Sequence, residues 1–300
     1  MEVAVMADIH GNYVALERCM ELCRERGIDT YFFLGDYAGE LAYPERTMKL
    51  LFEIREKYHC YFVRGNKEDY WRDYRDRGET GWKEYDSTTG SLYYSYHQLS
   101  QKSMDFYDSL PIQQKIQIGN FPEMTICHGS PVKTNQKMLP NHEETLEVMK
   151  NNDTNVILCG HTHLQRSIEH EGKYAWNAGA VGVSLMAEGK AQFMILSDEM
   201  NGDDNALLWN RKEALGMKYA FLSLPYEVGR VIDDLHAAGL DKYAPCWCQI
   251  TEYLLRKGDV AHGFVLNRAM ELCREKEGEC IWPQIPEKYW QQAVEEMIKC

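Results

Sequence analysis

Long apolar runs are missing from this chain of 300 residues. A membrane-spanning helix needs about 20 consecutive apolar residues, and no stretch of the sequence approaches that length. The first seven residues run directly into Asp8 and His10, with neither a basic start nor an apolar segment of signal-peptide length. We therefore expect a cytoplasmic protein with no membrane partner.

C-x-x-C pairs are also missing, although the chain has 10 cysteines. At this density, and without a secretion signal, reduced thiols are favoured over a disulfide framework. The CxC spacing of Cys246 and Cys248 is a weak signal for zinc, so we expect buried thiols there.

A segregated basic patch is missing as well. Acidic residues outnumber basic ones by 46 to 33, which gives a formal net charge of -13. The densest basic run, at 72–77, alternates with acidic residues, as on a solvated helix face. Binding to extended nucleic acid is therefore disfavoured. A small phosphorylated substrate is still allowed, because a bound metal supplies local positive charge.

The first 65 residues alternate between two kinds of pattern. Apolar runs at 2–7, 31–34 and 60–63 predict strands. Helical periodicity lies between them, at 13–26 and in a segment that begins at Pro44. Strands that alternate with helices predict an α/β fold with parallel strands.

Beyond residue 111 the pattern is dominated by strands and predicts a second sheet. The predicted strands lie at 112–118, 124–127, 156–159, 167–169, 174–176, 191–196, 206–209 and 218–224. The other predicted helices lie at 66–77, 95–108, 142–150, 226–238, 246–257, 260–276 and 287–298. Gly239, Gly258 and Gly278 follow three of these helices, as left-handed C-caps require. An acidic turn cluster at 198–205 is the clearest break in the chain.

Five short segments concentrate metal-ligand side chains, and each follows a predicted strand. They are Asp8-Ile9-His10-Gly11-Asn12, Gly35-Asp36, Gly65-Asn66, His128-Gly129 and Gly160-His161-Thr162-His163. Ligand sites of α/β sheets gather beyond the carboxyl ends of strands. If the chain stays extended, Asp8 and His10 face the same side, and so do His161 and His163. This mixture of carboxylate, imidazole and amide favours Mn, Fe, Zn, Co or Ni over Mg or Ca.

The series DIHGN, GD, GN, HGS and GHTH resembles the motifs of the calcineurin-like metallophosphoesterases. NAGAVG at 177–182 is similar to the compact bacterial and archaeal phosphodiesterase branch of that family. The resemblance covers residues 1–196 and extends more weakly to residue 258. It implies a two-sheet α/β-β/α sandwich at 1–258. We expect 259–300 to be a helical extension packed on that domain, with a homodimer contact as the alternative.

The resemblance also implies two divalent metal ions, with manganese favoured. The first ion would be held by Asp8, His10, Asp36 and His163. The second would be held by Asn66, His128 and His161, with Asp36 bridging. Such a pair clamps a phosphoryl oxygen and lowers the pKa of a bridging water, which attacks in line.

One departure from the family concerns the residue after Gly65-Asn66. Many members have a histidine there that contacts the phosphate, whereas this chain has Lys67 followed by Glu68. Lys67 has three open interpretations: a proton donor, a point charge on the phosphate, or a residue that points to solvent. Glu68 is expected to orient a ligand.

Two further assignments concern residues near the motifs and outside them. Asn12 either donates to a phosphate oxygen or caps the helix from residue 13, and we favour the cap. The six histidines outside the motifs are expected to be structural or surface residues. They are His59, His97, His142, His170, His236 and His262.

The predicted function is hydrolysis of a phosphate ester, most simply a phosphodiester, with the carboxylate of Asp36 central to catalysis. The alternatives are a phosphomonoesterase, a nucleotide pyrophosphohydrolase, or a non-catalytic scaffold that keeps the fold, as a retromer-type subunit does. Because competent residues fill all seven metal positions, the scaffold is the weaker alternative.

Overall fold

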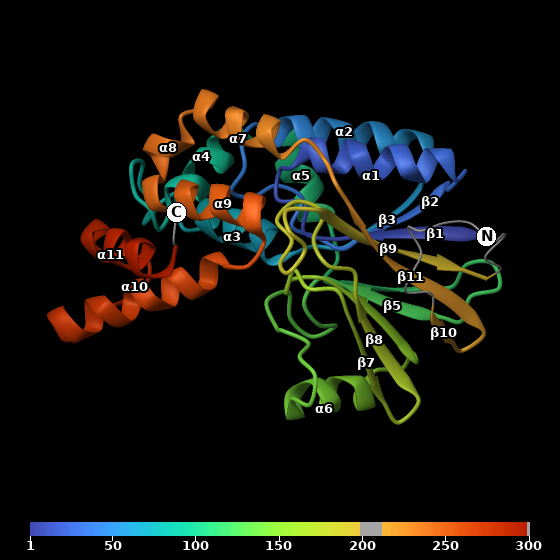
Figure 1. Cartoon of the computed structure of the whole chain (residues 1–300). Coiled ribbons are helices and arrows are strands. Elements are labelled where there is room, and N and C mark those ends of the chain that lie inside the picture. The colour runs from blue at the N-terminus through green and yellow to red at the C-terminus, as the bar shows by residue number, and fades with distance from the viewer. Residues whose placement is uncertain (199–211, 299–300) are drawn as a thin grey trace.

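Residues 1–198 and 212–298 are described by the computed structural model, shown in Figure 1. Its strands are β1 (Glu2–Met6), β2 (Thr30–Phe33), β3 (His59–Phe62), β4 (Gln113–Ile116), β5 (Met124–Cys127), β6 (Val156–Cys159), β7 (Arg166–His170), β8 (Lys173–Asn177), β9 (Ala191–Ser197), β10 (Lys212–Ala214) and β11 (Met217–Leu224). Within these ranges they form a six-stranded sheet, β10-β11-β9-β1-β2-β3, and a five-stranded sheet, β4-β5-β6-β8-β7.

The helices alternate with the strands at first and then gather at the end of the chain. The first six are α1 (Tyr13–Glu25), α2 (Pro44–Lys57), α3 (Asn66–Asp76), α4 (Gly90–Gln98), α5 (Gln101–Ser109) and α6 (Glu143–Asn151). The later ones are α7 (Val228–Ala237), α8 (Leu240–Tyr243), α9 (Pro245–Lys257), α10 (His262–Glu277) and α11 (Glu287–Met297). None of the helices in the described ranges is long and apolar enough to cross a membrane.

The centre of the six-stranded sheet is β1, which pairs in parallel with β2 and antiparallel with β9. Its residues after Glu2 are all buried, as expected for a strand covered on both faces. α1 and α2 lie along one face of this sheet (Figure 1). The predicted parallel arrangement is confirmed for β1, β2 and β3.

The other face of the six-stranded sheet packs on the five-stranded sheet. Val3 and Val5 of β1 share one apolar cluster with Ile126 of β5, Leu158 of β6 and Trp176 of β8. α6 contacts β7 and β8 on the outer face of the second sheet (Figure 1). The layers are therefore helix, sheet, sheet, helix, and the predicted two-sheet sandwich is confirmed.

A single helix predicted at 95–108 is wrong, because two helices occupy this region. α4 ends at Gln98, and Leu99 and Ser100 adopt extended backbone angles. The side chain of Ser100 accepts a hydrogen bond from the amide of Ser103, which begins a new helix at Gln101. The strand predicted at 206–209 and most of the acidic cluster at 198–205 lie outside the described residues.

The last helices share a second apolar centre, away from the sheets. α9, α10 and α11 contribute Ile250, Val265, Ala269 and Trp290 to one buried cluster, and α10 and α11 extend away from the sandwich (Figure 1). The predicted left-handed glycine caps are confirmed at Gly239 and Gly258, with φ angles of 76° and 72°. At Gly278 the left-handed cap is wrong, because its φ of 89° is combined with a ψ of -36°.

Candidate metal centre

The ends of five strands bring the predicted ligands together between the two sheets. Asp8 and His10 follow β1, Asp36 follows β2, and Asn66 begins α3 after β3. From the five-stranded sheet, His128 follows β5, while His161 and His163 follow β6. Backbone hydrogen bonds fix these loops on one another, such as that from the His10 amide to the Asp36 carbonyl at 2.9 Å.

The expectation that each ligand pair lies on an extended backbone is wrong. Five candidate ligands have positive φ, in the left-handed region that side chains with a Cβ disfavour. They are Asp8 at 54°, His10 at 52°, Asp36 at 53°, His161 at 66° and His163 at 56°. Such backbone costs roughly 1 to 3 kcal/mol per residue and collects at functional sites. The strands thus turn sharply at their ends, and the turns direct these side chains.

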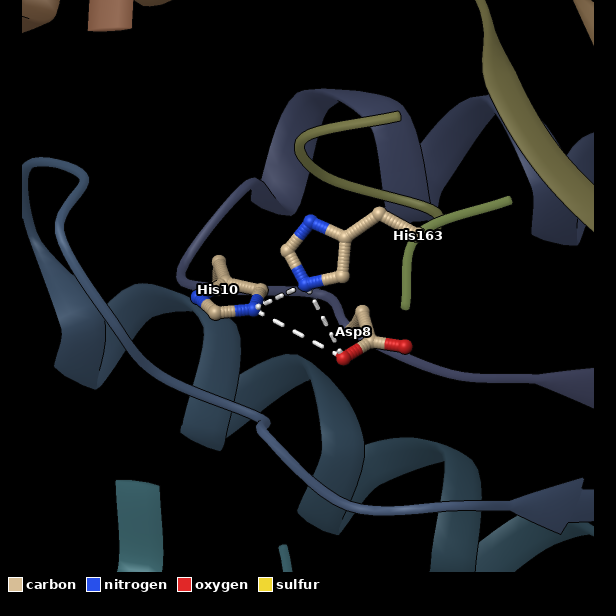
Figure 2. A group of neighbouring side chains, drawn as sticks. All are labelled: Asp8, His10 and His163. Atoms are coloured by element: carbon tan, nitrogen blue, oxygen red, sulfur yellow. Dashed lines mark hydrogen bonds and ion pairs between the residues drawn. The ribbon is translucent and has the colours of Figure 1, made fainter. Parts of the chain in front are cut away.

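A first group consists of Asp8, His10 and His163 (Figure 2). The Oδ1 atom of Asp8 lies 3.7 Å from His10 Nε2 and 3.2 Å from His163 Nε2. The two Nε2 atoms are themselves 3.2 Å apart. Asp8 Oδ1 is buried and has no hydrogen-bond partner within 1–198 and 212–298. An unpartnered buried carboxylate oxygen beside two imidazoles fits a cation.

The tautomers of these two histidines follow from their other contacts. His10 Nδ1 lies 2.7 Å from Glu40 Oε2, and His163 Nδ1 lies 2.9 Å from the Val183 carbonyl oxygen. Since both partners are acceptors, Nδ1 must carry the proton on each ring. With Nδ1 bound to its own acceptor, Nε2 is the ring atom that each histidine directs toward Asp8 Oδ1 and would offer to a metal ion. This is the arrangement of a ligand histidine oriented by an outer acceptor.

A second group consists of Asp8, Asp36 and His128, whose ligand atoms also lie within 4.8 Å of one another. His128 Nδ1 donates to the Leu34 carbonyl oxygen at 2.7 Å, so Nε2 is the ring atom that faces the site. That Nε2 lies 3.5 Å from Asp36 Oδ2 and 3.1 Å from Asn66 Oδ1. The amide of Asn66 is therefore placed beside the second group.

His161 lies at the edge of this cluster. Its ring centroid is 5.2 Å from that of His128, and its backbone amide donates to Asp8 Oδ2 at 2.8 Å. Burial, followed by the neighbouring His128, lowers the pKa of His161 to about 3. Its ring belongs to neither group within the described chain. All seven predicted ligands nevertheless meet in one region, and six contribute a side-chain oxygen or Nε2 atom to it.

The charges in the centre are strongly coupled. Burial alone would raise the pKa of Asp8, but His163 and His128 outweigh it and hold that pKa well below its usual range. Burial opposes a charge on His10, yet Glu40 and Asp8 raise the pKa of His10 to about 10. The cluster therefore holds carboxylates ionised in a buried place, where a cation stabilises them.

Glu68 holds the backbone that carries Asp36. Its carboxylate accepts hydrogen bonds from the amides of Asp36, Tyr37 and Gly65, at 3.0, 2.9 and 2.7 Å. Burial, with Asp36 adding to it, raises the pKa of Glu68 to about 7. A Cβ atom at Gly65 would overlap Asp36 Oδ1, so only glycine fits here. Glu68 thus positions Asp36 by holding the backbone of its loop.

Lys67 does not point to solvent, so that interpretation is wrong. Its Nζ forms an ion pair with Glu40 Oε1, and its side chain is only 11% exposed. The other oxygen of Glu40 accepts from His10, so one buried carboxylate connects Lys67 to a candidate ligand. Sequence reasoning missed Glu40, because nothing in its spacing distinguishes it from other acidic loop residues.

The helix cap predicted at Asn12 is confirmed. Its Oδ1 accepts from the amide of Ala15 at 3.0 Å, and its Nδ2 donates to Gly182 O and Tyr226 Oη. Both the oxygen and the nitrogen of the Asn12 side-chain amide thus bind groups of the protein. His262, expected to be a structural or surface residue, is half-buried and also lies within electrostatic reach of Glu40 and Lys67.

Comparisons with known proteins agree with this fold. The sequence profile described as the calcineurin-like phosphoesterase superfamily domain matches residues 1–200. The uncharacterized protein MJ0912 of Methanocaldococcus jannaschii is 26% identical over 216 residues, which cover 66% of this chain and 83% of that protein.

Two solved structures are similar over most of the chain. The hypothetical protein PH1004 of Pyrococcus horikoshii has a TM-score of 0.67 at 21% identity, over 87% of this chain and 99% of that one. A metallophosphoesterase from Sphaerobacter thermophilus has a TM-score of 0.59 at 21% identity, over 80% of this chain and 95% of that one. At this identity, the likeness describes the fold.

Proposed function

Because this chain belongs to the calcineurin-like phosphoesterase superfamily, we propose that it hydrolyses a phosphodiester at a pair of divalent metal ions. The family and the candidate ligands make it a metal-dependent phosphoesterase. One observation supports the pair above all: Asp36 Oδ2 lies 3.5 Å from both His10 Nε2 and His128 Nε2. A single carboxylate oxygen between two histidines suits a ligand shared by two ions.

The proposed ligand sets follow the family resemblance and share Asp36, whereas Asp8 is the residue common to the two groups. One ion would be held by Asp8, His10, Asp36 and His163. The other would be held by Asp36, Asn66, His128 and His161. The nitrogen and oxygen donors suit Mn, Fe, Zn, Co or Ni, and we favour manganese. When bound, the two ions would neutralise phosphate charge and lower the pKa of a bound water.

The protein residues position these ligands. Glu40 fixes the tautomer of His10, and Glu68 fixes the loop of Asp36 through three amide hydrogen bonds. Asn12 holds the loop after β1 by capping α1 and donating to Gly182. In this scheme Lys67 compensates the charge of Glu40, while Asp36 is the ligand on which catalysis depends.

The charge balance favours a diester over a monoester. A phosphodiester carries one negative charge at neutral pH, whereas a monoester approaches two, as a phosphorylated side chain does. The positive charge of Lys67 is already neutralised by Glu40. Lys67 therefore offers no net positive charge to a second negative charge on the phosphate. This pairing is less favourable for a phosphomonoesterase or a pyrophosphohydrolase, whose substrates carry more negative charge.

We also propose a substrate size, an assembly and a compartment for this protein. The substrate is a small phosphorylated compound rather than extended nucleic acid, which the net charge of -13 would repel. A homodimer through the C-terminal helices is the proposed assembly, and light scattering tests it. The described cysteines are free thiols, which suits a reducing compartment such as the cytoplasm.

The substitution Asp36→Asn tests the proposed centre. We expect it to abolish hydrolysis, because it removes the charge of the ligand that both ions share. The matched control is Asp73→Asn on α3, where the carboxylate is 64% exposed and pairs with Arg77. Metal content is measured in both variants. Full activity of Asp36→Asn at normal metal content would overturn the assignment.

The substrate class is tested by removing bound metal, adding manganese, and comparing an aryl phosphodiester with the matching aryl monoester. Metal-dependent turnover that favours the diester supports the proposal. A preference for the monoester would make the chain a phosphomonoesterase. If neither ester is hydrolysed while metal is bound, the scaffold alternative or a narrow substrate range takes its place.

A further inference from the structure

His262 brings a residue from the C-terminal helices to the metal centre. It is the first residue of α10, beyond the residues that match the family profile. Its electrostatic interactions reach Glu40 and Lys67, and also the two candidate ligands His10 and His163. Neither its spacing nor a motif predicted this placement.

The chain around His262 is tied to the loop that orients His163. The Val183 carbonyl accepts from His163 Nδ1, and three residues later the Met186 amide donates to the Gly258 carbonyl at 2.6 Å. Gly258 ends α9, and α10 begins four residues further on. The junction between the two helices is thus hydrogen-bonded to the loop that orients His163.

The ring of His262 is held by two residues of α9. It stacks on Trp247, with 4.3 Å between centroids and 21° between planes. Its Nε2 atom lies 2.8 Å from Thr251 Oγ1. Thr251 has one hydroxyl proton, which it donates to the Trp247 carbonyl oxygen at 2.8 Å. Thr251 can therefore only accept from His262, so Nε2 carries the imidazole proton.

The other ring nitrogen is consequently a bare acceptor. Burial lowers the pKa of His262 to about 3, with Lys67 and His10 adding to this and Glu40 opposing it, so the ring is neutral at neutral pH. Nδ1 has no hydrogen-bond partner among the described residues. It is also not one of the unpartnered atoms there that are fully buried, so part of its surface is open. This lone pair is therefore accessible, on a residue that is electrostatically coupled to the candidate ligands His10 and His163.

We propose that His262 Nδ1 accepts a hydrogen bond from a hydroxyl or N–H of the organic group of the substrate. The site would thus select phosphate esters of hydroxyl-bearing groups, such as polyols or sugars. This inference rests on the proposed function and adds the substrate class to it. A bare acceptor repels a further phosphate oxygen, which is also an acceptor, but attracts a donor.

The test compares two diesters with the same leaving group, glyceryl p-nitrophenyl phosphate and methyl p-nitrophenyl phosphate. Glutamine places its amide nitrogen near Nε2 and keeps the Thr251 contact, whereas asparagine places its amide near Nδ1. We expect His262→Gln to lower the ratio of kcat/KM for the glyceryl over the methyl ester about tenfold, chiefly through KM. His262→Asn should recover most of that ratio.

The surface substitution His170→Gln is the control and should leave the ratio unchanged. If His262→Gln lowers kcat/KM for both esters equally, His262 is structural and the inference is wrong. The ring nitrogens of His262 are also followed by 15N NMR at neutral pH, which needs no activity. Protonation at Nδ1 instead of Nε2 would equally overturn the inference.

Failure of the proposed function gives a different result. In that case the wild-type protein with manganese hydrolyses neither ester. Binding of the same two esters to the manganese-loaded protein is then measured by calorimetry. Tighter binding of the glyceryl ester, lost in His262→Gln, supports the inference alone, and equal binding of the two esters overturns it.

Discussion

Three histidines of the candidate metal centre are oriented by the acceptor that each Nδ1 contacts. The acceptors are a carboxylate for His10 and backbone carbonyls for His128 and His163. The carbonyls keep their geometry whatever the pH, whereas the carboxylate of Glu40 is itself held by Lys67. His10 is therefore the ligand whose orientation depends most on side chains.

This dependence predicts different effects for the two partners of the buried pair. Lys67→Ala should lower turnover of activated esters less than about tenfold, because a lysine paired with Glu40 is not the proton donor, which would contribute about a hundredfold or more. Glu40→Gln should weaken metal binding about 10- to 100-fold, because the acceptor that orients His10 loses its charge. Metal titration and steady-state kinetics measure the two effects. A hundredfold loss in Lys67→Ala would show that Lys67 is catalytic.

At the scale of elements, the loop after β8 is pressed against α9. Gly189 has a φ angle of 71°, and a Cβ atom there would overlap the carbonyl oxygen of Leu255 in α9. Gly216 has a φ angle of 76° in the turn between β10 and β11, with open space around it. The two glycines thus share a backbone conformation and differ in their surroundings.

We predict that Gly216→Ala lowers the free energy of unfolding by about 1 kcal/mol, the cost of a Cβ in left-handed backbone. Gly189→Ala should cost about 1 to 3 kcal/mol more, because the loop must also move away from α9. Urea unfolding measures both variants. Equal losses would mean that the loop and α9 separate freely.

Several elements were predictable because local signals set them. The capping residue Asn12 and the glycines after α9 and α10 act within one turn, so the sequence alone locates these helix ends. The break between α4 and α5 was not predicted, since helical periodicity continues across it and only the Ser100 cap interrupts it. A single capping hydroxyl in an apolar pattern is a weak signal.

At the scale of the whole molecule, the sequence predicts the candidate metal ligands better than the residues that surround them. The motifs carry enough ligand side chains to identify the strand ends that meet. Glu40 and His262 belong to no motif, and they reach the centre only through the tertiary fold. The boundary at residue 258 stays a prediction, although α9 on one side packs on α10 and α11 on the other.

The stabilisation of the whole fold by metal should depend on pH. The pKa of His10 is about 10 in the folded protein, against 6.5 for a free histidine. Its proton therefore stabilises the metal-free fold fully below about pH 6.5, and this contribution is lost as the pH rises toward about 10. A bound metal displaces that proton, so metal and proton compete.

We predict that a fixed manganese concentration stabilises the protein by about 2 kcal/mol more at about pH 8 than at about pH 6.5. Thermal unfolding with and without manganese at the two pH values measures the difference, and calorimetry in two buffers counts the released protons. The same stabilisation at both pH values would contradict the raised pKa of His10.

The position of β1 also has a consequence for synthesis of the chain. One edge of this buried strand pairs with β2, which lies within the first 33 residues. The other edge pairs with β9 at residues 191–197, which are synthesised much later. While the ribosome makes the intervening segment, an apolar strand edge is open to wrong partners. Nascent chains shorter than β9 should therefore bind chaperones at β1, and release should follow the emergence of residue 197.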